Sequence, residues 1–290
     1  MALLEITNLK KYFPLKSPPW AKEKNCVRAV DGVSLSVNAG ENFSIVGESG
    51  SGKSTLARVV MKLIAADEGR LLFNGTDYTR LKGRKMAGLY RDIQMVFQDP
   101  YSSLDPRFSV RRILSEAFVL LKAEKPSGSE KEQRMARMLN AVGLSADVLP
   151  RYPHEFSGGE RQRIAIARAL MVQPKLLILD EAVSSLDVLI QAQILELLAK
   201  LQKDFHLTYL FISHNLKVVR KISQRVAVMY KGRIVELAPV AGLFENPLHE
   251  YTRELLSAAI EYKPVSRTEE ISVPKKSQLI DKGNGHFVMM

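Results

Sequence analysis

The spacing of apolar residues predicts an α/β chain that begins with strands. Residues 5–9 and 33–37 suit half-buried strands, and residues 43–46 form an apolar run typical of a buried one. A helix is predicted next, because several apolar residues follow its period: Leu56, Val59, Val60, Leu63 and Ile64. We expect this helix to end between residues 65 and 69, followed by a short strand and a turn at 74–75.

The pattern changes in residues 109–172, which are predicted to be helical. Ser109 and Ser129 are suited to cap the starts of two helices, and Glu132 would complete a capping box with Ser129. This segment therefore differs in character from the β-rich residues before it.

The last third of the predicted domain returns to alternating strands and helices. Residues 176–179 and 209–212 are short apolar runs typical of buried parallel strands, and residues 188–201 between them predict a helix. Residues 226–237 predict a hairpin.

A complete phosphate-binding loop lies between the strand at 43–46 and the helix after it. It has the pattern G-x-x-x-x-G-K-[ST] in the strand-to-helix context that the motif requires, and it comprises Gly47, Glu48, Ser49, Gly50, Ser51, Gly52, Lys53, Ser54 and Thr55. Its glycines let backbone N–H groups surround a phosphate at the positive end of the helix. Lys53 would reach the β- and γ-phosphates, and the Ser54 hydroxyl would ligate Mg²⁺. A Gly/Ser loop that matches by chance is the alternative, and the flanking elements argue against it. The sequence therefore predicts binding of a nucleoside triphosphate.

An apolar strand that ends in Asp180 and Glu181 predicts catalytic carboxylates. Ligands lie at the carboxyl ends of parallel strands, so both side chains would face the phosphate loop. Asp180 would hold Mg²⁺ through water, and Glu181 would polarise the water that attacks the γ-phosphate. A solvated acidic turn would be the better interpretation of Asp-Glu alone, but not in a chain with a phosphate loop.

Ser157, Gly158 and Gly159 begin a predicted helix and offer a hydroxyl and backbone N–H groups to an anion. Because the chain already has one complete phosphate cradle, a second anion site suggests that it serves a nucleotide held by a neighbouring subunit. The tripeptide alone would be weak evidence, since such sequences often only cap helices.

Composition limits the classes of protein that this chain can represent. The chain has 290 residues, a net charge of +11 and no internal repeat, so one nucleotide-binding domain is expected over residues 1–262. Prolines and glycines predict a loosely structured tail, 263–290. Lys and Arg are spread along the chain, which favours a solvated basic surface and no nucleic-acid partner. Cys26 is the only cysteine, which excludes a disulfide within the chain. No apolar run is close to the about 20 residues that a membrane-spanning helix needs. The first residues do not have the pattern of a secretory signal, so secretion is not expected.

The order of these motifs resembles that of the ATP-binding cassette (ABC) ATPases. By this resemblance, Gln98 matches the Q-loop glutamine that links the Mg²⁺ and water site to the transmembrane partner, and Asp187 lies in a match to the D-loop at the dimer interface. His214 matches the switch histidine that contacts the γ-phosphate. Tyr12 and Phe13 lie where the family stacks an aromatic ring on adenine, and we expect Phe13 to be the residue that does so.

The resemblance implies the α/β fold of the ABC ATPases. Its core is that of a P-loop NTPase, RecA-like, with an N-terminal antiparallel β subdomain and an inserted α-helical subdomain at about residues 90–170. Three segments narrow the match to the ATPases of oligopeptide, dipeptide and nickel importers, chiefly to their second ATPase subunit: residues 98–107, 151–159 and 246–252.

The implied function is hydrolysis of ATP, with Mg²⁺, that powers uptake of oligopeptides, dipeptides or a similar solute. The implied partners are a sister ABC ATPase subunit in a heterodimer, two transmembrane permease subunits and an extracytoplasmic solute-binding protein. They would hold the chain at the cytoplasmic face of the membrane. Residues 98–107 are expected to contact the permeases, with Tyr101 and Leu104 at the apolar centre of the contact.

The sequence departs from the family pattern at Glu160, Ala182 and Asn215, where Gln, Pro and Asp are usual, and its tail lacks the cysteines of related proteins. Glu160 would place a negative charge close to a phosphate site. Three other functions stay open: an importer ATPase for nickel or another solute, an accessory ATPase of a non-transport assembly, such as one for phosphonate breakdown, and a structural partner that turns ATP over slowly. The intact catalytic residues argue against the last.

Overall fold

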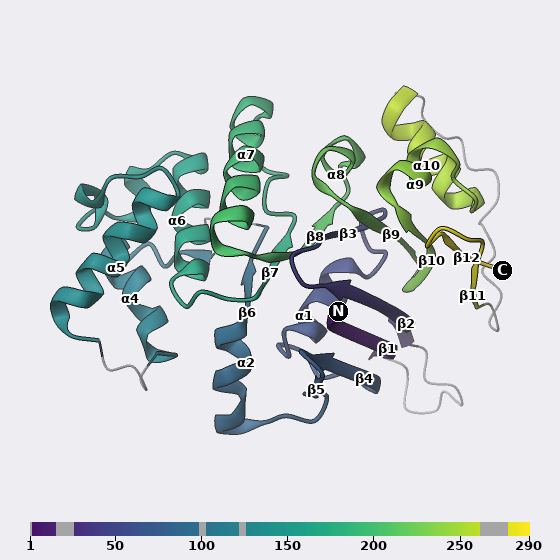
Figure 1. Ribbon diagram of the computed structural model, residues 1–290, viewed down its shortest axis with the longest axis horizontal. Coiled ribbons are helices and arrows are strands. Elements are labelled where there is room, and N and C mark those ends of the chain that lie inside the picture. The colour runs from purple at the N-terminus through teal and green to yellow at the C-terminus, as the bar shows by residue number, and fades with distance from the viewer. Residues whose placement is uncertain (1, 16–25, 99–102, 122–125, 262–277) are drawn as a thin grey trace. The chain divides into compact units, whose positions relative to one another are not determined.

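A computed structural model describes residues 2–15, 26–98, 103–121, 126–261 and 278–290. The chain divides into two compact units, one made of Met1–Arg80 and Phe211–Met290, the other of Leu81–Leu210. The first unit is therefore built from both ends of the chain, as the colours in Figure 1 show. Strand β8 (Thr208–Ser213) contains the boundary between the units.

An antiparallel sheet forms the N-terminal part of the first unit. Its strand order is β2-β1-β4-β5, with bounds β1 Ala2–Pro14, β2 Cys26–Asn38, β4 Glu68–Phe73 and β5 Thr76–Asp77. Ile6 of β1 pairs with Leu35 on one side and Leu71 on the other. Asn74 and Gly75 make the predicted turn, with φ angles of 48° and 73°. The predicted antiparallel β subdomain is confirmed.

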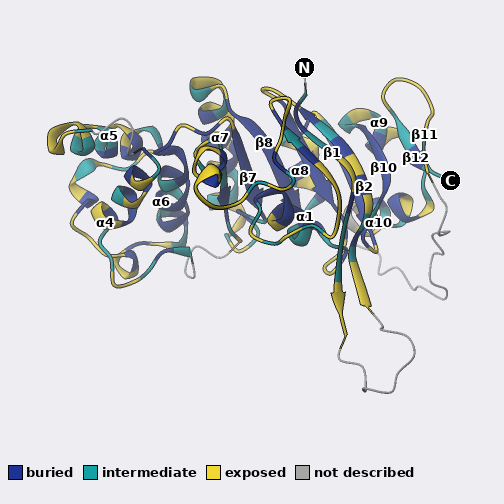
Figure 2. Ribbon diagram, turned by 90° about the horizontal axis from the view of Figure 1, so that it is seen from below, coloured by how far each residue is buried: buried dark blue, intermediate teal, exposed yellow. Residues whose placement is uncertain are grey.

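A second set of strands carries the core of this unit. Strand β3 (Asn42–Val46) pairs in parallel with β9 (Arg225–Tyr230), so that Ile45 lies opposite Ala227. β9 forms an antiparallel hairpin with β10 (Arg233–Pro239), which confirms the predicted hairpin. β10 is buried along most of its length, as Figure 2 shows. The helices of this unit are α1 Lys53–Val60, α8 Leu216–Ile222, α9 Val240–Glu245 and α10 Glu250–Glu261.

Helix α1 ends at Val60, earlier than the predicted end between residues 65 and 69. Lys62 takes a left-handed φ of 60°, and the N–H of Leu63 returns to the carbonyl of Arg58 at 2.9 Å. A left-handed residue followed by such a backward hydrogen bond terminates a helix. The side chain of Leu63 is exposed. Its spacing from the earlier apolar residues therefore does not mark the buried face of a helix.

The end of the predicted tail is ordered, which corrects the expectation of a loose segment. Strands β11 (Leu279–Asp281) and β12 (Phe287–Met289) form a hairpin, and β12 pairs with β10, placing Val288 opposite Glu236. Residues 262–277 lie outside the described part of the chain. Gly283 and Gly285, taken from sequence as breakers, form the turn of this hairpin with φ angles of 95° and 71°. Strands of three residues are too short to give a detectable period.

The second unit combines a parallel strand pair with helices. β6 (Ile93–Val96) pairs with β7 (Leu176–Asp180), so that Val96 lies opposite Leu179. Its longer elements are α2 Met86–Asp92, α4 Val110–Ser115, α5 Gly128–Ala141, α6 Gly158–Leu170 and α7 Val188–Phe205. Short 3₁₀ turns lie at Gly83–Lys85, Glu116–Val119, Ala146–Val148 and Pro153–Glu155. Helices α4 to α6 lie within the segment expected to be helical.

Serine caps begin these helices, one of them at a residue other than the predicted one. Ser109 caps α4 as expected, its Oγ accepting from the N–H of Arg112. Helix α5 starts after Ser127, which forms a capping box with Glu130, rather than after Ser129. Both serines precede a glutamate by three residues, and Glu132 instead forms an ion pair with Arg111.

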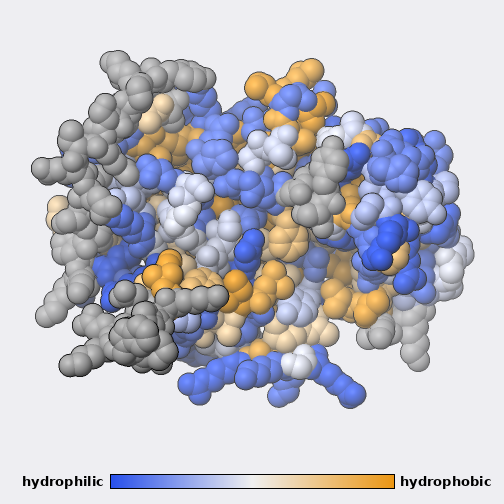
Figure 3. Space-filling model, turned by 180° about the vertical axis from the view of Figure 1, so that it is seen from behind, coloured by the Kyte–Doolittle hydropathy of each residue, from blue (hydrophilic) through white to orange (hydrophobic). Residues whose placement is uncertain are grey.

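Both polar and apolar residues reach the surface. On the face drawn in Figure 3, hydrophobic residues are exposed in separate patches between hydrophilic ones. In the described parts of the chain, every helix is too short or too polar to cross a membrane.

The contact between the C-terminal hairpin and β10 gives a first prediction. His286 Nε2 lies 2.6 Å from Oε1 of Glu236, whose side chain is fully buried. We expect His286→Ala to lower the free energy of unfolding by about 1–3 kcal/mol, because it removes one hydrogen-bond partner of a buried polar group. Urea denaturation measures this, with Lys282→Ala in the exposed turn as the control. Equal stability of the two variants would show that the hairpin contributes nothing through this contact.

Candidate functional site

The phosphate loop connects β3 to α1 and depends on close backbone packing at two glycines. A Cβ atom on Gly47 would lie 2.2 Å from the carbonyl oxygen of Met229, and one on Gly52 would lie 2.0 Å from that of Ala29. Both residues also have left-handed φ angles, 150° and 109°. Only glycine satisfies both conditions, so these two positions fix the path of the loop between β2 and β9.

Lys53 lies at the centre of this loop. Its side chain is buried, and Nζ donates to the carbonyl oxygens of Gly47 at 2.9 Å and Glu48 at 2.8 Å. Ser51 Oγ lies 3.3 Å from the same nitrogen. Ser54 and Thr55 follow in the first turn of α1, where the helix N-terminus adds partial positive charge. The loop therefore concentrates a buried ammonium group and a helix N-terminus, as a phosphate site requires.

Two contacts from distant residues hold the loop, and sequence reasoning missed both. The N–H of Glu48 donates to the hydroxyl of Tyr251 at 3.0 Å, and the N–H of Gly232 donates to the carbonyl of Ser51 at 2.9 Å. Tyr251 lies in the segment 246–252 that carried the family resemblance, but nothing in its local pattern indicates a contact with the loop.

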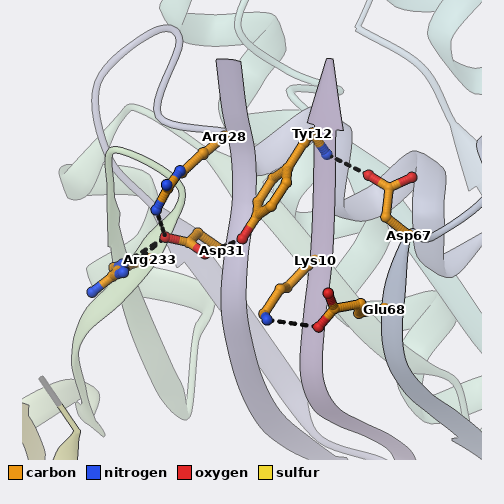
Figure 4. A network of polar contacts seen from close by, with 7 residues as sticks. All are labelled: Lys10, Tyr12, Arg28, Asp31, Asp67, Glu68 and Arg233. Atoms are coloured by element: carbon orange, nitrogen blue, oxygen red, sulfur yellow. Dashed lines mark hydrogen bonds and ion pairs between the residues drawn. The ribbon is translucent and has the colours of Figure 1, made fainter. Parts of the chain in front are cut away.

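The two aromatic residues near the end of β1 have different environments. The Tyr12 hydroxyl donates to Asp31 at 2.5 Å, and Asp31 also accepts from Arg233 at 2.8 Å (Figure 4). The pKa of Tyr12 is raised to about 12, chiefly by burial and next by the hydrogen bond to Asp31. Phe13 points to the opposite face of the strand, because successive side chains alternate, and the residue is 38% exposed. Phe13 is thus the more exposed of the two, with Lys11 Nζ 5.5 Å from the centroid of its ring, whereas Tyr12 is half-buried.

His214 follows β8 directly and is exposed. The next residue, Asn215, caps α8: its Oδ1 accepts from the N–H groups of Lys217 at 3.1 Å and Val218 at 3.3 Å. An aspartate, usual at this position in the family, would accept the same hydrogen bonds. Asn215 therefore preserves the helix start that follows His214.

In the second unit, Asp180 and Glu181 lie where the sequence predicts, at the carboxyl end of β7. Because β6 and β7 are parallel and in register, Gln98 leaves the sheet at the same edge as this carboxylate pair. Asp180 is 3% exposed. Glu181 has a left-handed φ of 49°, and its carbonyl accepts from Ser184 Oγ at 2.8 Å, so the turn that carries it is fixed locally.

Ser157 caps helix α6 in a reciprocal capping box with Glu160. The carboxylate of Glu160 accepts from the N–H of Ser157 at 2.8 Å and from its hydroxyl at 2.7 Å. These two hydrogen bonds hold the pKa of Glu160 below its usual value, and the one from the Ser157 hydroxyl has the larger effect. The side chain that departs from the family pattern thus has a structural role, since glutamate and glutamine serve equally in a capping box.

Gly158 and Gly159 pack against the segment that contains Asp187. A Cβ atom on Gly159 would lie 2.6 Å from Ile190, and one on Gly158 would lie 3.6 Å from Leu186. Asp187 caps α7, its Oδ1 accepting from the N–H of Ile190 at 2.9 Å. The structure therefore brings these predicted site residues together within one unit.

The predicted site residues divide between the two units. The first unit holds Phe13, the phosphate loop 47–55 and His214, and the second holds Gln98, Ser157, Gly158, Gly159, Asp180, Glu181 and Asp187. One expectation is wrong: Leu104 is 1% exposed, so it belongs to the core and not to a permease-binding surface. Tyr101, its expected companion, lies outside the described residues.

The donor groups suit magnesium better than a transition metal. In the part of the chain that the structure describes, His, Cys, Asp and Glu form no cluster of three or more that could hold a metal ion. The predicted ligands Ser54, Asp180 and Gln98 instead offer hydroxyl, carboxylate and amide oxygens. Mg²⁺ prefers oxygen ligands, keeps several waters and commonly takes its remaining ligands from substrate phosphates.

Comparisons with known proteins show which family the chain resembles. Residues 30–184 match the ABC transporter family. The oligopeptide transport ATP-binding protein AppF of Bacillus subtilis is 47% identical over 282 residues, which cover 97% of this chain and 83% of AppF. OppF of the same organism is 46% identical over 99% of this chain and 95% of its own length. The glutathione import ATP-binding protein GsiA of Pectobacterium atrosepticum is 44% identical, and the match covers 99% of this chain but 48% of GsiA.

Solved structures give the same result. The ADP conformation of MJ1267, an ATP-binding cassette of an ABC transporter, is 29% identical with a TM-score of 0.71, covering 88% of this chain and 98% of that one. The dimeric post-hydrolysis state of the ATP-binding cassette MJ0796, bound to ADP and Pi, is 27% identical with a TM-score of 0.70, covering 82% and 98%.

The position of Lys53 predicts how strongly nucleotide binding depends on it. We expect Lys53→Ala to weaken ATP binding more than about tenfold, because a hydrogen bond from a charged donor contributes about 1.5–3 kcal/mol. Titration with a fluorescent ATP analogue measures the effect. Lys62→Ala is the matched control, since Lys62 also donates to a backbone carbonyl, that of Thr79 at 2.5 Å, outside the loop. Unchanged affinity in a folded Lys53→Ala protein would refute the assignment of the loop.

Proposed function

This chain belongs to the ABC transporter family, and on that premise we propose that it is the ATP-hydrolysing subunit of an importer for oligopeptides or a similar solute. The observation that carries the proposal is the similarity to OppF, which extends over nearly the whole of both chains. AppF and OppF are named for oligopeptide transport and GsiA for import of glutathione, which is itself a short peptide. The expected solute is therefore peptide-like.

ATP binds first through the phosphate loop. Lys53 moves from the carbonyls of Gly47 and Glu48 to the β- and γ-phosphates, which present stronger negative charge to its ammonium group. The adenine ring stacks on the exposed Phe13, since the hydroxyl of Tyr12 is already hydrogen-bonded to Asp31.

Mg²⁺ would be held by Ser54, Gln98 and, through water, Asp180. When bound, it neutralises charge on the phosphates during transfer. Glu181 orients and polarises the attacking water, and Ser184 fixes the backbone that carries it. His214 contacts the γ-phosphate. Catalysis thus rests on positioning and electrostatics, so the reaction is slow until all these groups are assembled.

A sister ATPase subunit completes the site. Ser157, Gly158 and Gly159 present a helix N-terminus to the ATP of that subunit, and Asp187 lies beside them. The neighbouring Val188 and Leu189 are 82% and 69% exposed, an apolar pair that burial against a partner would stabilise. The remaining partners are two permease subunits and an extracytoplasmic solute-binding protein, with the chain at the cytoplasmic face of the membrane.

Transport by the reconstituted complex tests the proposal. We expect proteoliposomes that contain this chain, its sister ATPase and the permeases to accumulate a labelled oligopeptide when ATP and the binding protein are supplied. Glu181→Gln should abolish uptake while ATP still binds, because water attack stalls after the dimer has closed. Uptake at the parental rate by the Glu181→Gln complex would remove Glu181 from the mechanism, and the absence of peptide uptake by the parental complex would refute the solute class.

Action across the subunit boundary predicts where a change at Ser157 has its effect. Ser157→Arg should leave ATP binding to the isolated chain nearly intact, yet block hydrolysis at the partner's site. Both this variant and the matched control Ser127→Arg lose a serine cap with its capping box, at a cost of about 1 kcal/mol, but only Ser157 faces the partner in this proposal. To leave only the sister subunit's loop active, both variants also carry Lys53→Ala, and hydrolysis is measured with the intact sister subunit. Equal hydrolysis with the two variants would rule out the role in trans.

A further inference from the structure

The hydroxyl of Tyr251 binds the phosphate loop from outside the loop's own sequence. It accepts the N–H of Glu48 at 3.0 Å, and the ring packs against Tyr230 with 4.3 Å between ring centroids. The side chain of Tyr251 is fully buried. A buried hydroxyl is costly unless it is hydrogen-bonded, so this contact is a specific one and not an incidental approach.

Both backbone polar groups of Glu48, its N–H and its carbonyl, form hydrogen bonds. Its N–H binds Tyr251, and its carbonyl accepts from the N–H of Ser51 at 3.2 Å and from Lys53 Nζ at 2.8 Å. The side chain of Glu48 is exposed and takes no part in these contacts with the loop. Tyr251 therefore fixes the peptide unit whose carbonyl lies against the lysine that would meet the phosphates.

The position of Tyr251 is itself fixed by a buried carboxyl group. Glu236 of β10 is fully buried, and its two oxygens accept the N–H groups of Leu248 at 2.8 Å and His249 at 2.9 Å. His249 Nδ1 in turn accepts the N–H of Tyr251 at 3.1 Å. These hydrogen bonds anchor the start of α10 to β10, so the hydroxyl of Tyr251 reaches the loop from a rigid base.

We propose that Tyr251 is a positioning residue for nucleotide binding: its hydroxyl holds Glu48 so that the phosphate loop is already in its binding conformation before ATP arrives. This rests on the proposed function in that the loop binds the phosphates of ATP. A glycine-rich loop loses much conformational entropy when it is ordered, and a loop ordered in advance does not lose it on binding. The hydroxyl acts through the loop and does not touch the nucleotide.

Tyr251→Phe tests the proposal, since it removes the hydroxyl and keeps the ring. The matched control is Tyr209→Phe: Tyr209 is also buried, and its hydroxyl also binds one backbone group, the carbonyl of Leu198 at 2.8 Å in the other unit. We expect the dissociation constant for MgADP and the KM for ATP to rise about fivefold in Tyr251→Phe, a factor that one neutral hydrogen bond accounts for. The kcat should change less than twofold, and Tyr209→Phe should match the parental protein in all three constants.

Each outcome decides the question. Equal nucleotide affinity of the two Tyr→Phe variants overturns the proposal, even if both are destabilised. If Lys53→Ala also leaves affinity unchanged, the proposed function itself fails; if Lys53→Ala abolishes binding, only the role of Tyr251 fails. Amide hydrogen exchange on the parental protein supplies a measurement that needs no variant. Slow exchange of the Glu48 N–H without nucleotide supports the proposal, and unprotected exchange overturns it.

Discussion

The absence of space for a side chain at Gly47 and Gly52 is the constraint on which the nucleotide site depends. At each position a Cβ atom would overlap a carbonyl oxygen, that of Met229 in β9 or that of Ala29 in β2. Gly232, in the turn after β9, is restricted in the same way by the carbonyl of Arg28. Three glycines therefore let the loop, β2 and the β9–β10 turn approach one another through their backbones. The shape of the phosphate cradle is set by this packing and not only by the conformational freedom of glycine.

The features that the sequence predicts correctly are those whose cause is local. The phosphate loop is recognised by glycines at fixed spacing, and the β9–β10 hairpin by residues that accept a left-handed turn. The carboxylates Asp180 and Glu181 are recognised by the apolar strand that precedes them. Ser127 and Ser129 show the limit of local information, because both satisfy the same capping pattern. The helix starts after Ser127, and Glu132 instead pairs with Arg111 from another helix.

What the sequence does not reveal depends on contacts between distant residues. Tyr251 and Glu48 are separated by most of the chain, and no periodicity connects them. The hairpin β11–β12 gains its stability from pairing with β10 and from the buried Glu236, not from its own short strands. Leu104 likewise lies in a segment whose mixture of apolar and charged residues suggests a surface contact, whereas the fold buries its side chain.

The order in which the chain is synthesised has a consequence for the first unit, because its two halves come from opposite ends of the sequence. β3 and the phosphate loop leave the ribosome early, but their parallel partner β9 and the supporting Tyr251 follow some 180 to 200 residues later. Pairings of such high sequence separation form slowly, since a long loop must close first. The nascent loop therefore stays without its native support until Tyr251 has been synthesised. During that interval the apolar strand beside it is exposed to chaperones and to wrong partners.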